Sequence, residues 1–235
     1  LGMASLLPHK RIGWNESYDV EINGQSTKGL ENRNELLQAT VKDSVALSYD
    51  EIKDMRVTEL RDVIRRQGKK VIYIYHNAID ARGDNAATER EVFFAVEEAI
   101  AELKQLINDL VNKVDATHIL ITADHGFIYQ RSDLQEYDKT SLKLNDVGLE
   151  KRRFFITHHP EPSEGTLTIS LDYLLGDGSG TYTIVPRGTN RFKRQGAGAN
   201  FVHGGAMLQE IAVPVIQFKN DRSKSSKNEV KKVQV

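Results

Sequence analysis

Two short apolar segments on either side of one long amphipathic segment constrain the fold of this chain most strongly. Residues 71–75 (Val-Ile-Tyr-Ile-Tyr) are β-branched, aromatic and continuously apolar, which is typical of a strand buried on both faces of a parallel sheet. Residues Thr117–Ala123 have the same character. Between them, Thr88–Val114 repeats apolar residues in steps of three and four, which predicts an amphipathic helix about 40 Å long. Thr88 and Glu91 have the spacing of a capping box.

Strand, helix and strand in this order predict a βαβ unit with a right-handed crossover in a parallel sheet, and therefore an α/β fold. Residues 1–47 are mixed and rich in turn formers. Before the βαβ unit, the pattern favours a hairpin around Asn23-Gly24, helices over Glu31–Val41 and over Tyr49–Arg66 with a break near Val57-Thr58, and a helix C-cap at Gly68. After the unit, it favours strands at Phe154–Ile156, Thr166–Leu171, Thr181–Val185 and Val213–Ile216, with a turn at Gly176–Gly180.

The composition excludes several classes of protein. The 32 basic residues are balanced by 33 acidic ones, so the broad basic surface needed for non-specific nucleic-acid binding is excluded. The absence of cysteine excludes disulfides and thiolate chemistry. No apolar run is long enough to span a membrane, and the first residues, Leu1-Gly2-Met3, do not resemble a signal peptide. Because the chain does not begin with methionine, we expect it to be a piece of a longer one.

Acidic residues and histidines follow both predicted strands. His76, Asp80 and Asp84 come after the first strand, and Asp124-His125 come after the second. The carboxyl ends of parallel strands meet at one edge of a sheet, where α/β proteins place their sites. A carboxylate beside an imidazole suits a divalent metal. His203, next to two glycines and just before the last predicted strand, is a further candidate ligand.

Each motif alone also has an ordinary structural explanation. An Asp-His-Gly sequence is commonly a turn, and His203 between glycines could be one as well. Asp80 and Asp84 could simply begin a helix, whose dipole favours acidic side chains in the first turn. Their joint placement at strand ends is what favours a metal site, since two metals about 4 Å apart would need about this many ligands.

These residues, taken in order, resemble the PglZ domain, a branch of the alkaline phosphatase superfamily found in bacterial phage-defence (BREX) systems. The resemblance lies in residues 1–9, 75–80 with Gly83-Asp84, 122–127, 203–205, 209–210 and 213–214. It implies a mixed, mostly parallel sheet sandwiched by helices and truncated on its N-terminal side. Residues 1–218 would be the C-terminal part of that domain, and residues 219–235 a basic linker or the start of a following element.

The resemblance also implies two divalent metal ions, zinc or manganese. One would be held by Asp80 and His203, with Asp84 at a position where many relatives have histidine; His76 could supply that imidazole instead. The second would be held by Asp124 and His125. The family's nucleophile, a serine or threonine, and its early aspartate are expected upstream of Leu1. No catalytic nucleophile is therefore assigned within this chain.

The implied function is that of a metal-dependent phosphohydrolase or phosphodiesterase domain in phage defence, inactive in this fragment. Arg187 and Arg191 precede the late histidine and could bind a phosphate oxygen, although surface arginines are the simpler explanation. The implied location is the bacterial cytoplasm. The implied partners are other defence proteins and an unidentified phosphorylated substrate, with nucleic acid only as a substrate and no membrane. A scaffold or docking module with a structural or vestigial metal site is an alternative, and a phosphomutase is a third.

Overall fold

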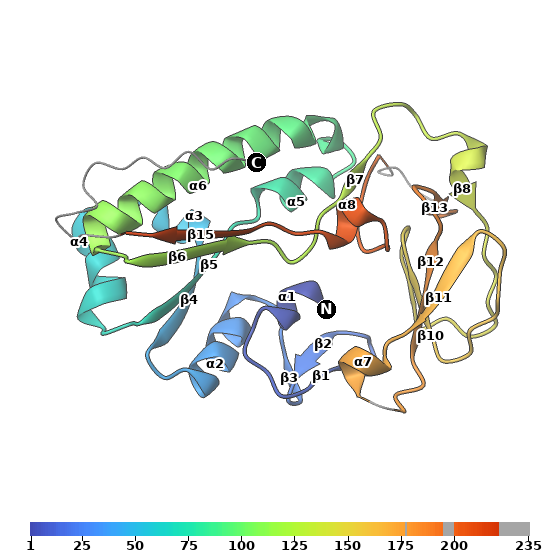
Figure 1. Cartoon of the computed structure of the whole chain (residues 1–235), viewed down its shortest axis with the longest axis horizontal. Coiled ribbons are helices and arrows are strands. Elements are labelled where there is room, and N and C mark those ends of the chain that lie inside the picture. Colours follow the sequence, from blue (N-terminus) through green and yellow to red (C-terminus); the bar gives the residue numbers. More distant parts are fainter. Residues whose placement is uncertain (177, 195–199, 221–235) are drawn as a thin grey trace.

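A computed structural model of the chain describes residues 1–176, 178–194 and 200–220. The central pattern of the sequence is present as β5 (Val71–Tyr75), α6 (Val92–Val114) and β6 (His118–Thr122). In Figure 1, β5 and β6 run in the same direction and α6 covers them. The α/β class is therefore confirmed, with helices and several small sheets in one mixed structure.

The pairing of these strands differs from the simple βαβ expectation. β5 pairs in parallel with β4 (Ser44–Ser48), a strand that was not predicted. β6 pairs antiparallel with β15 (Val215–Lys219), so among the described residues β5 and β6 are not hydrogen-bonded neighbours. Parallel pairing is otherwise described only between β8 (Lys139–Thr140) and β13 (Arg191–Phe192), while the remaining described pairs are antiparallel.

The long helix begins later than the capping box predicted. A 3₁₀ turn, η2 (Glu89–Glu91), precedes α6, and Glu91 is the N-cap of α6. The Thr88 hydroxyl donates to the carbonyl of Arg82 instead of capping the helix. The capping-box prediction is therefore wrong, because this hydroxyl stabilises the end of the preceding helical segment.

Helices cover β4 and β5 and close the first part of the core. They are α2 (Leu30–Thr40), α3 (Tyr49–Ile52), α4 (Val57–Arg61), the π-helical η1 (Asp62–Arg66) and α5 (Ala78–Gly83). The predicted break in the second helical segment is real and lies at residues 53–56, and Gly68 follows the last turn with a φ of +68°. Side chains of α3, α4, η1 and α6 pack against β5 in one cluster: Ile52, Leu60, Ile64, Leu110 and Val114.

The N-terminal residues form α1 (Gly2–Ser5) and a small antiparallel sheet. Its strands are β1 (Ile12–Trp14), β2 (Val20–Ile22) and β3 (Gln25–Ser26). Asn23 and Gly24 both have positive φ, which is the geometry of a tight hairpin turn, so the predicted hairpin is confirmed.

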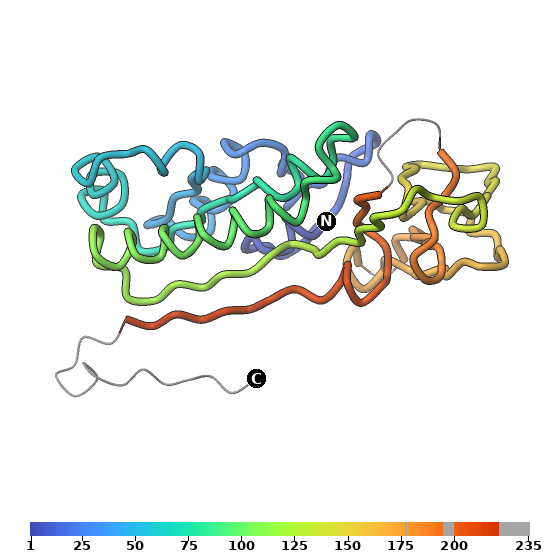
Figure 2. The backbone as a smooth tube through the Cα atoms, turned by 90° about the horizontal axis from the view of Figure 1, so that it is seen from above, coloured from blue at the N-terminus to red at the C-terminus, as the bar shows by residue number. Residues whose placement is uncertain are grey.

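The segment between β6 and β15 forms a second lobe at one end of the molecule (Figure 2). Its main sheet is antiparallel, in the order β11-β12-β10-β9. The predicted strands in this region are confirmed with small shifts of their ends. The elements are β7 (Ile128–Tyr129), η3 (Glu136–Asp138), β8 (Lys139–Thr140), β9 (Leu149–Glu150), β10 (Phe155–Thr157), β11 (Thr166–Ser170), α7 (Asp172–Leu175), β12 (Tyr182–Pro186), β13 (Arg191–Phe192), β14 (Phe201–Val202) and α8 (Leu208–Ile211).

Two expected features reach residues outside the described ranges. The turn at 176–180 is present, with the Ser179 amide donating to the Gly176 carbonyl, but Asp177 itself lies outside them. Of the basic segment 219–235, Lys219 ends β15 and Asn220 follows it, while 221–235 lie outside the described residues.

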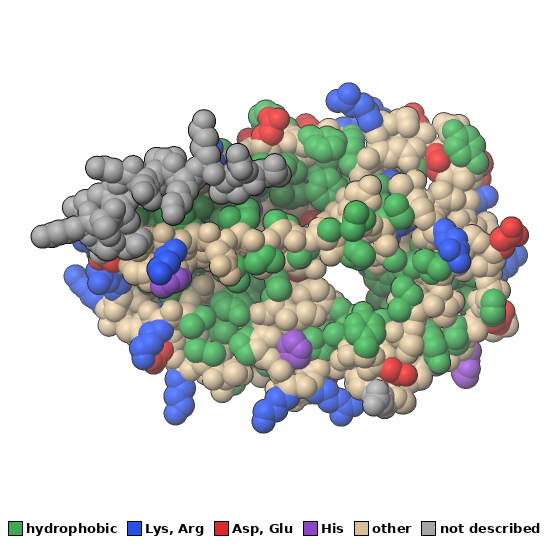
Figure 3. All heavy atoms as spheres, viewed as in Figure 1, with side chains coloured by type: hydrophobic (Ala, Val, Ile, Leu, Met, Phe, Trp, Pro, Cys, Tyr) green, Lys and Arg blue, Asp and Glu red, His purple; other side chains and the backbone are tan. Residues whose placement is uncertain are grey.

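The β6–β15 pair is more exposed than the sequence predicted. Figure 2 shows the two strands side by side on the outside of the molecule, and Figure 3 shows hydrophobic side chains gathered on that face. Leu120 is 60% exposed, and Val215 and Ile216 are exposed as well. The prediction that the second strand is buried on both faces is therefore wrong within the described residues. No helix in those residues is both long and apolar enough to cross a membrane.

Candidate metal centre

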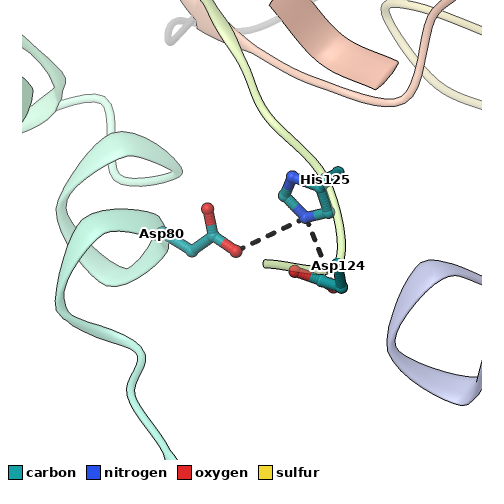
Figure 4. Close-up of side chains that lie close together, drawn as sticks. All are labelled: Asp80, Asp124 and His125. Atoms are coloured by element: carbon teal, nitrogen blue, oxygen red, sulfur yellow. Dashed lines mark ion pairs between the residues drawn. The ribbon is translucent and has the colours of Figure 1, made fainter. Parts of the chain in front are cut away.

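Three predicted ligands meet where α5 faces the end of β6. Asp80 lies in the first turn of α5, and Asp124 and His125 directly follow β6. The Nε2 atom of His125 lies 3.5 Å from Asp80 Oδ2 and 3.6 Å from Asp124 Oδ2 (Figure 4). One donor atom from each of the three residues lies within 4.8 Å of the other two, which is close enough for a single cation to contact all three.

Two further predicted ligands adjoin this group. His203 follows β14, and its Nε2 atom lies 3.4 Å from Asp84 Oδ1. The rings of His203 and His125 are stacked, with centroids 4.2 Å apart and planes 1° from parallel. Residues from three distant parts of the chain thus form one continuous group of donors: Asp80, Asp84, Asp124, His125 and His203.

Close backbone packing brings these segments together. A Cβ atom on Gly83 would lie 2.6 Å from the ring of Phe201, so glycine lets α5 approach β14. Phe201 is buried and also packs against Phe127, with centroids 4.8 Å apart. Gly83, Phe127 and Phe201, each within two residues of a candidate ligand, therefore pack together. Their packing sets the distance between the segments that carry the candidate ligands.

The donors suit a divalent metal ion. Carboxylate oxygens and imidazole nitrogens are common ligands of zinc and manganese. The Nδ1 atom of His125 lies 3.1 Å from the carbonyl oxygen of Gly126, to which a protonated Nδ1 would donate. With that proton on Nδ1, the Nε2 atom that faces Asp80 and Asp124 would have its lone pair available for a metal.

The electrostatics of the group favour a cation as well. Partial burial raises the pKa of Asp80, and the nearby Asp124 and Asp84 carboxylates raise it further, while His125 and His203 act in the opposite direction. Ionising Asp80 is thus costly in the chain alone. A bound cation would offset that cost, since carboxylates bind metals in their deprotonated form.

Sequence comparisons give the family of the chain. Residues 1–218 match the family described as the BREX system PglZ alkaline phosphatase-like domain. The chain belongs to the PglZ family. It is 55% identical over its whole length to "Alkaline phosphatase-like protein PglZ" of Bacillus cereus (strain H3081.97). It is also 38% identical over 223 residues, 93% of the chain, to "Alkaline phosphatase-like protein BrxZ" of Escherichia coli O9:H4 (strain HS).

The chain covers 27% of the Bacillus PglZ protein and 25% of the Escherichia BrxZ protein. It therefore spans about a quarter of the length of these relatives. The family assignment therefore concerns the stretch that the chain covers.

In this PglZ-family chain, the sixth predicted ligand does not join the group. His76 Nε2 lies 2.7 Å from Glu102 Oε2 on α6, and the ring packs on Tyr49 with centroids 4.8 Å apart. These contacts connect the end of β5 to α3 and α6. The structure therefore gives no support to the alternative in which His76 replaces Asp84 as a ligand.

The two candidate phosphate-binding arginines make other contacts in this PglZ-family chain. Arg187 is exposed, and its amide donates to Gly165 at the end of the β11–β12 pair. Arg191 is 1% exposed and donates to main-chain oxygens of Thr189 and Asn200. Burial, and then the charge of Arg153, lower its pKa to about 10. The simple interpretation of Arg191 as a surface arginine is therefore wrong, while its role as a phosphate ligand stays a prediction.

Three buried charged residues near the site had no predicted role. Glu89 accepts hydrogen bonds from the amides of Asn200 and Phe201, just before His203. Arg153 and Glu210 form an ion pair with fully buried side chains. The one sequence signal for a role of Glu210 was its place in a stretch that resembles the PglZ family. The residues around Glu89 and Arg153 in the sequence indicated no role for them.

Proposed function

We propose that this chain is the metal-binding part of a phosphohydrolase or phosphodiesterase domain acting in a BREX phage-defence system. The observation that carries the proposal is the convergence of Asp80, Asp84, Asp124, His125 and His203 from segments far apart in the sequence. Three carboxylates gathered at a partly exposed surface repel one another, and a bound cation would relieve that repulsion.

In the proposed centre, Asp80, Asp84 and His203 would hold one divalent ion, zinc or manganese. Asp124 and His125, whose imidazole lies 3.5 Å from Asp80, would hold the other. Such ions lower the pKa of an attacking hydroxyl and neutralise the charge on phosphoryl oxygens. The five side chains supply ligands and no nucleophile. We therefore propose that a hydroxyl from a part of the protein outside this stretch attacks the phosphorus and displaces the alcohol of the phosphate ester, and that water then releases the phosphoryl group from that hydroxyl. We also propose that the 235-residue chain alone is inactive.

The wider context is part of the same proposal. We place the protein in the bacterial cytoplasm, together with other defence proteins and an unidentified phosphorylated substrate. Residues 1–218 would act as one domain, followed by a linker or a further element.

A docking module with a structural or vestigial metal site is the second candidate. The observation in its favour is Asp84, whose side chain is 61% exposed and contacts only one imidazole in the proposed first site. A site with one weak ligand could hold a metal for structural reasons only.

Calorimetric titration with zinc and manganese tests the metal centre. We expect binding by the unaltered chain and its loss in Asp124→Ala and His203→Ala. His158→Ala is the matched control, because His158 is exposed, lies outside the proposed centre and contacts the Gly180 carbonyl. If Asp124→Ala bound metal as well as the unaltered chain, the proposed centre would be wrong.

Hydrolysis of bis-p-nitrophenyl phosphate by a full-length PglZ relative separates the two candidates. Activity that disappears when the aspartate aligned with Asp124 is replaced by alanine supports the enzyme. Metal binding without activity, together with retained capture of a partner protein, supports the docking module. Hydrolysis by the 235-residue chain itself would contradict the proposed inactivity.

A further inference from the structure

We propose that Glu210 is a positioning residue that holds the Asp124-His125 loop and the His203 loop in one fixed arrangement. The inference rests on the proposed function, since it concerns residues that support the proposed ligands. Glu210 lies in the four-residue helix α8 and contacts neither carboxylate nor imidazole of the metal centre itself. It acts through the main chain of both loops.

The side chain of Glu210 binds the loop that carries His203. Its Oε1 atom accepts from the Gly205 amide at 2.9 Å, and its Oε2 atom accepts from the Met207 amide at 3.1 Å. Gly205 is two residues beyond His203. A Cβ atom at Gly205 would lie 2.6 Å from Glu210 Oε2, so only glycine allows the loop to come this close.

The main chain of Glu210 binds the other loop. Its carbonyl accepts from the Gly126 amide at 2.8 Å, directly after His125. A Cβ atom at Gly126 would lie 2.1 Å from the carbonyl oxygen of Gln209, which again requires glycine. One residue is thus bonded to the chain beside both histidines, whose rings stack 4.2 Å apart.

Arg153 fixes the orientation of the Glu210 carboxylate. Its Nε atom donates to Oε1 at 2.8 Å and its Nη2 atom donates to Oε2 at 2.6 Å, in a two-point contact with both side chains 0% exposed. Arg153 also donates to the carbonyls of Gly188 and Asn190 in the second lobe. The carboxylate is therefore held by four donors, two from Arg153 and two from the His203 loop.

The energetics favour a positional role over a purely stabilising one. Burying an ion pair costs about as much as the attraction returns, so such pairs are weak evidence for net stability. Groups that orient metal ligands from behind have a larger effect on the metal, typically about 10–100-fold in affinity. Here the oriented groups are two loops, and the distance between His125 and His203 depends on both.

Cobalt(II) titration followed by visible absorption tests the proposal, because the spectrum reports the arrangement of the donors. We expect Glu210→Gln to bind Co²⁺ at least about 10-fold more weakly and with an altered spectrum. The double variant Arg153→Met, Glu210→Leu removes both buried charges together and is therefore expected to fold, yet to show the same defect. Ile184→Ala, in the core of the second lobe, is the matched control that loses stability and keeps the spectrum.

Amide hydrogen exchange of the unaltered, metal-free chain provides a test that needs no variant and no metal. The Gly126, Gly205 and Met207 amides should be protected and should open together. A double variant that binds Co²⁺ with unchanged affinity and spectrum would overturn the proposal, as would an unprotected Gly205 amide. If the unaltered chain bound no Co²⁺ while the three amides exchanged as one unit, the proposed function would fail and the positioning role would stand.

Discussion

Two groups of acidic side chains lie close together in this molecule and have opposite surroundings. Asp80, Asp84 and Asp124 are partly exposed, and their nearest basic partners are imidazole nitrogens 3.4–3.6 Å away. Glu89 and Glu210 are buried and accept hydrogen bonds at 2.6–3.2 Å from main-chain amides or from arginine. The carboxylate oxygens of the first group are available to bind a ligand. Those of the second group are occupied by hydrogen bonds from N–H groups of the protein.

The difference shows how the same chemical group serves two purposes. A carboxylate whose partners are all internal fixes the chain, so its removal should cost stability and also loosen the loops that it holds. A carboxylate that lacks such partners is available for a cation, and its removal should mainly cost binding. Each of the following predictions compares one group with the other.

The largest effect should come from Arg153→Met. This change leaves the fully buried Glu210 carboxylate without its charged partner, which typically costs about 3–5 kcal/mol of unfolding free energy. Urea denaturation of the metal-free chain measures it. Arg187→Met is the control, because Arg187 is exposed and its replacement should stay within ~0.5 kcal/mol. Equal losses of unfolding free energy in the two variants would show that the buried ion pair matters no more to stability than an exposed arginine.

A smaller loss is expected for Glu89→Gln. The change keeps the shape of the side chain but removes the charge that faces the Asn200 and Phe201 amides. Charge-assisted hydrogen bonds are roughly twice as strong as neutral ones, so two of them should lose about 2 kcal/mol together. Glu91→Gln, two residues away on an exposed side chain, is the control in the same denaturation experiment. A loss confined to Glu89→Gln would confirm its structural role.

The positions of the proposed metal ligands could be predicted from the sequence, and the pairing of the strands could not. Asp80, Asp124 and His125 follow apolar runs, so their place at strand ends is a local property of the chain. The partner of β6 is β15, which lies about 90 residues later, and nothing near β6 specifies it. Likewise β4 is short and ends in serines, so it lacks the apolar run that identified β5.

The burial of charged residues could not be predicted from the sequence either. Arg153 and Arg191 are fully buried, although arginine is usually exposed. Only the folded chain brings Glu210 to Arg153 and the Asn200 carbonyl to Arg191. The residues that support the site were therefore missed, while five of the six candidate ligands lie together in the structure.

On the ligand side of the comparison, Asp124→Asn should have little effect on the metal-free chain. Asp124 has a nearby imidazole and a neighbouring carboxylate, so removing its charge should change the unfolding free energy by no more than ~0.5 kcal/mol. Zinc affinity measured by calorimetry should fall at least about 10-fold, since one ligand charge is lost. Asp133→Asn, at an exposed position, should change neither quantity. A large loss of stability in Asp124→Asn would place this residue with the structural carboxylates instead.

The smallest effect concerns the pH dependence that Asp80 contributes. Its pKa in the folded chain is raised above the ordinary value of 3.8, chiefly by burial, so the folded state binds more protons than the unfolded state between those two pKa values. The stability of the metal-free chain should therefore decrease as the pH rises through that window, and Asp80→Asn should remove this part of the slope. Urea midpoints measured in the presence of a chelator, from pH 4 upward, report it.

Addition of zinc should reverse the sign of that slope. Metal binding requires the ionised carboxylate, so it favours the folded state more strongly as Asp80 loses its proton. A chain that is destabilised by rising pH without metal and stabilised by it with metal would show that Asp80 belongs to the ligand group. A slope that zinc leaves unchanged would show that Asp80 is only a partly buried acid, and the contrast between the two groups of carboxylates would then rest on Asp84 and Asp124 alone.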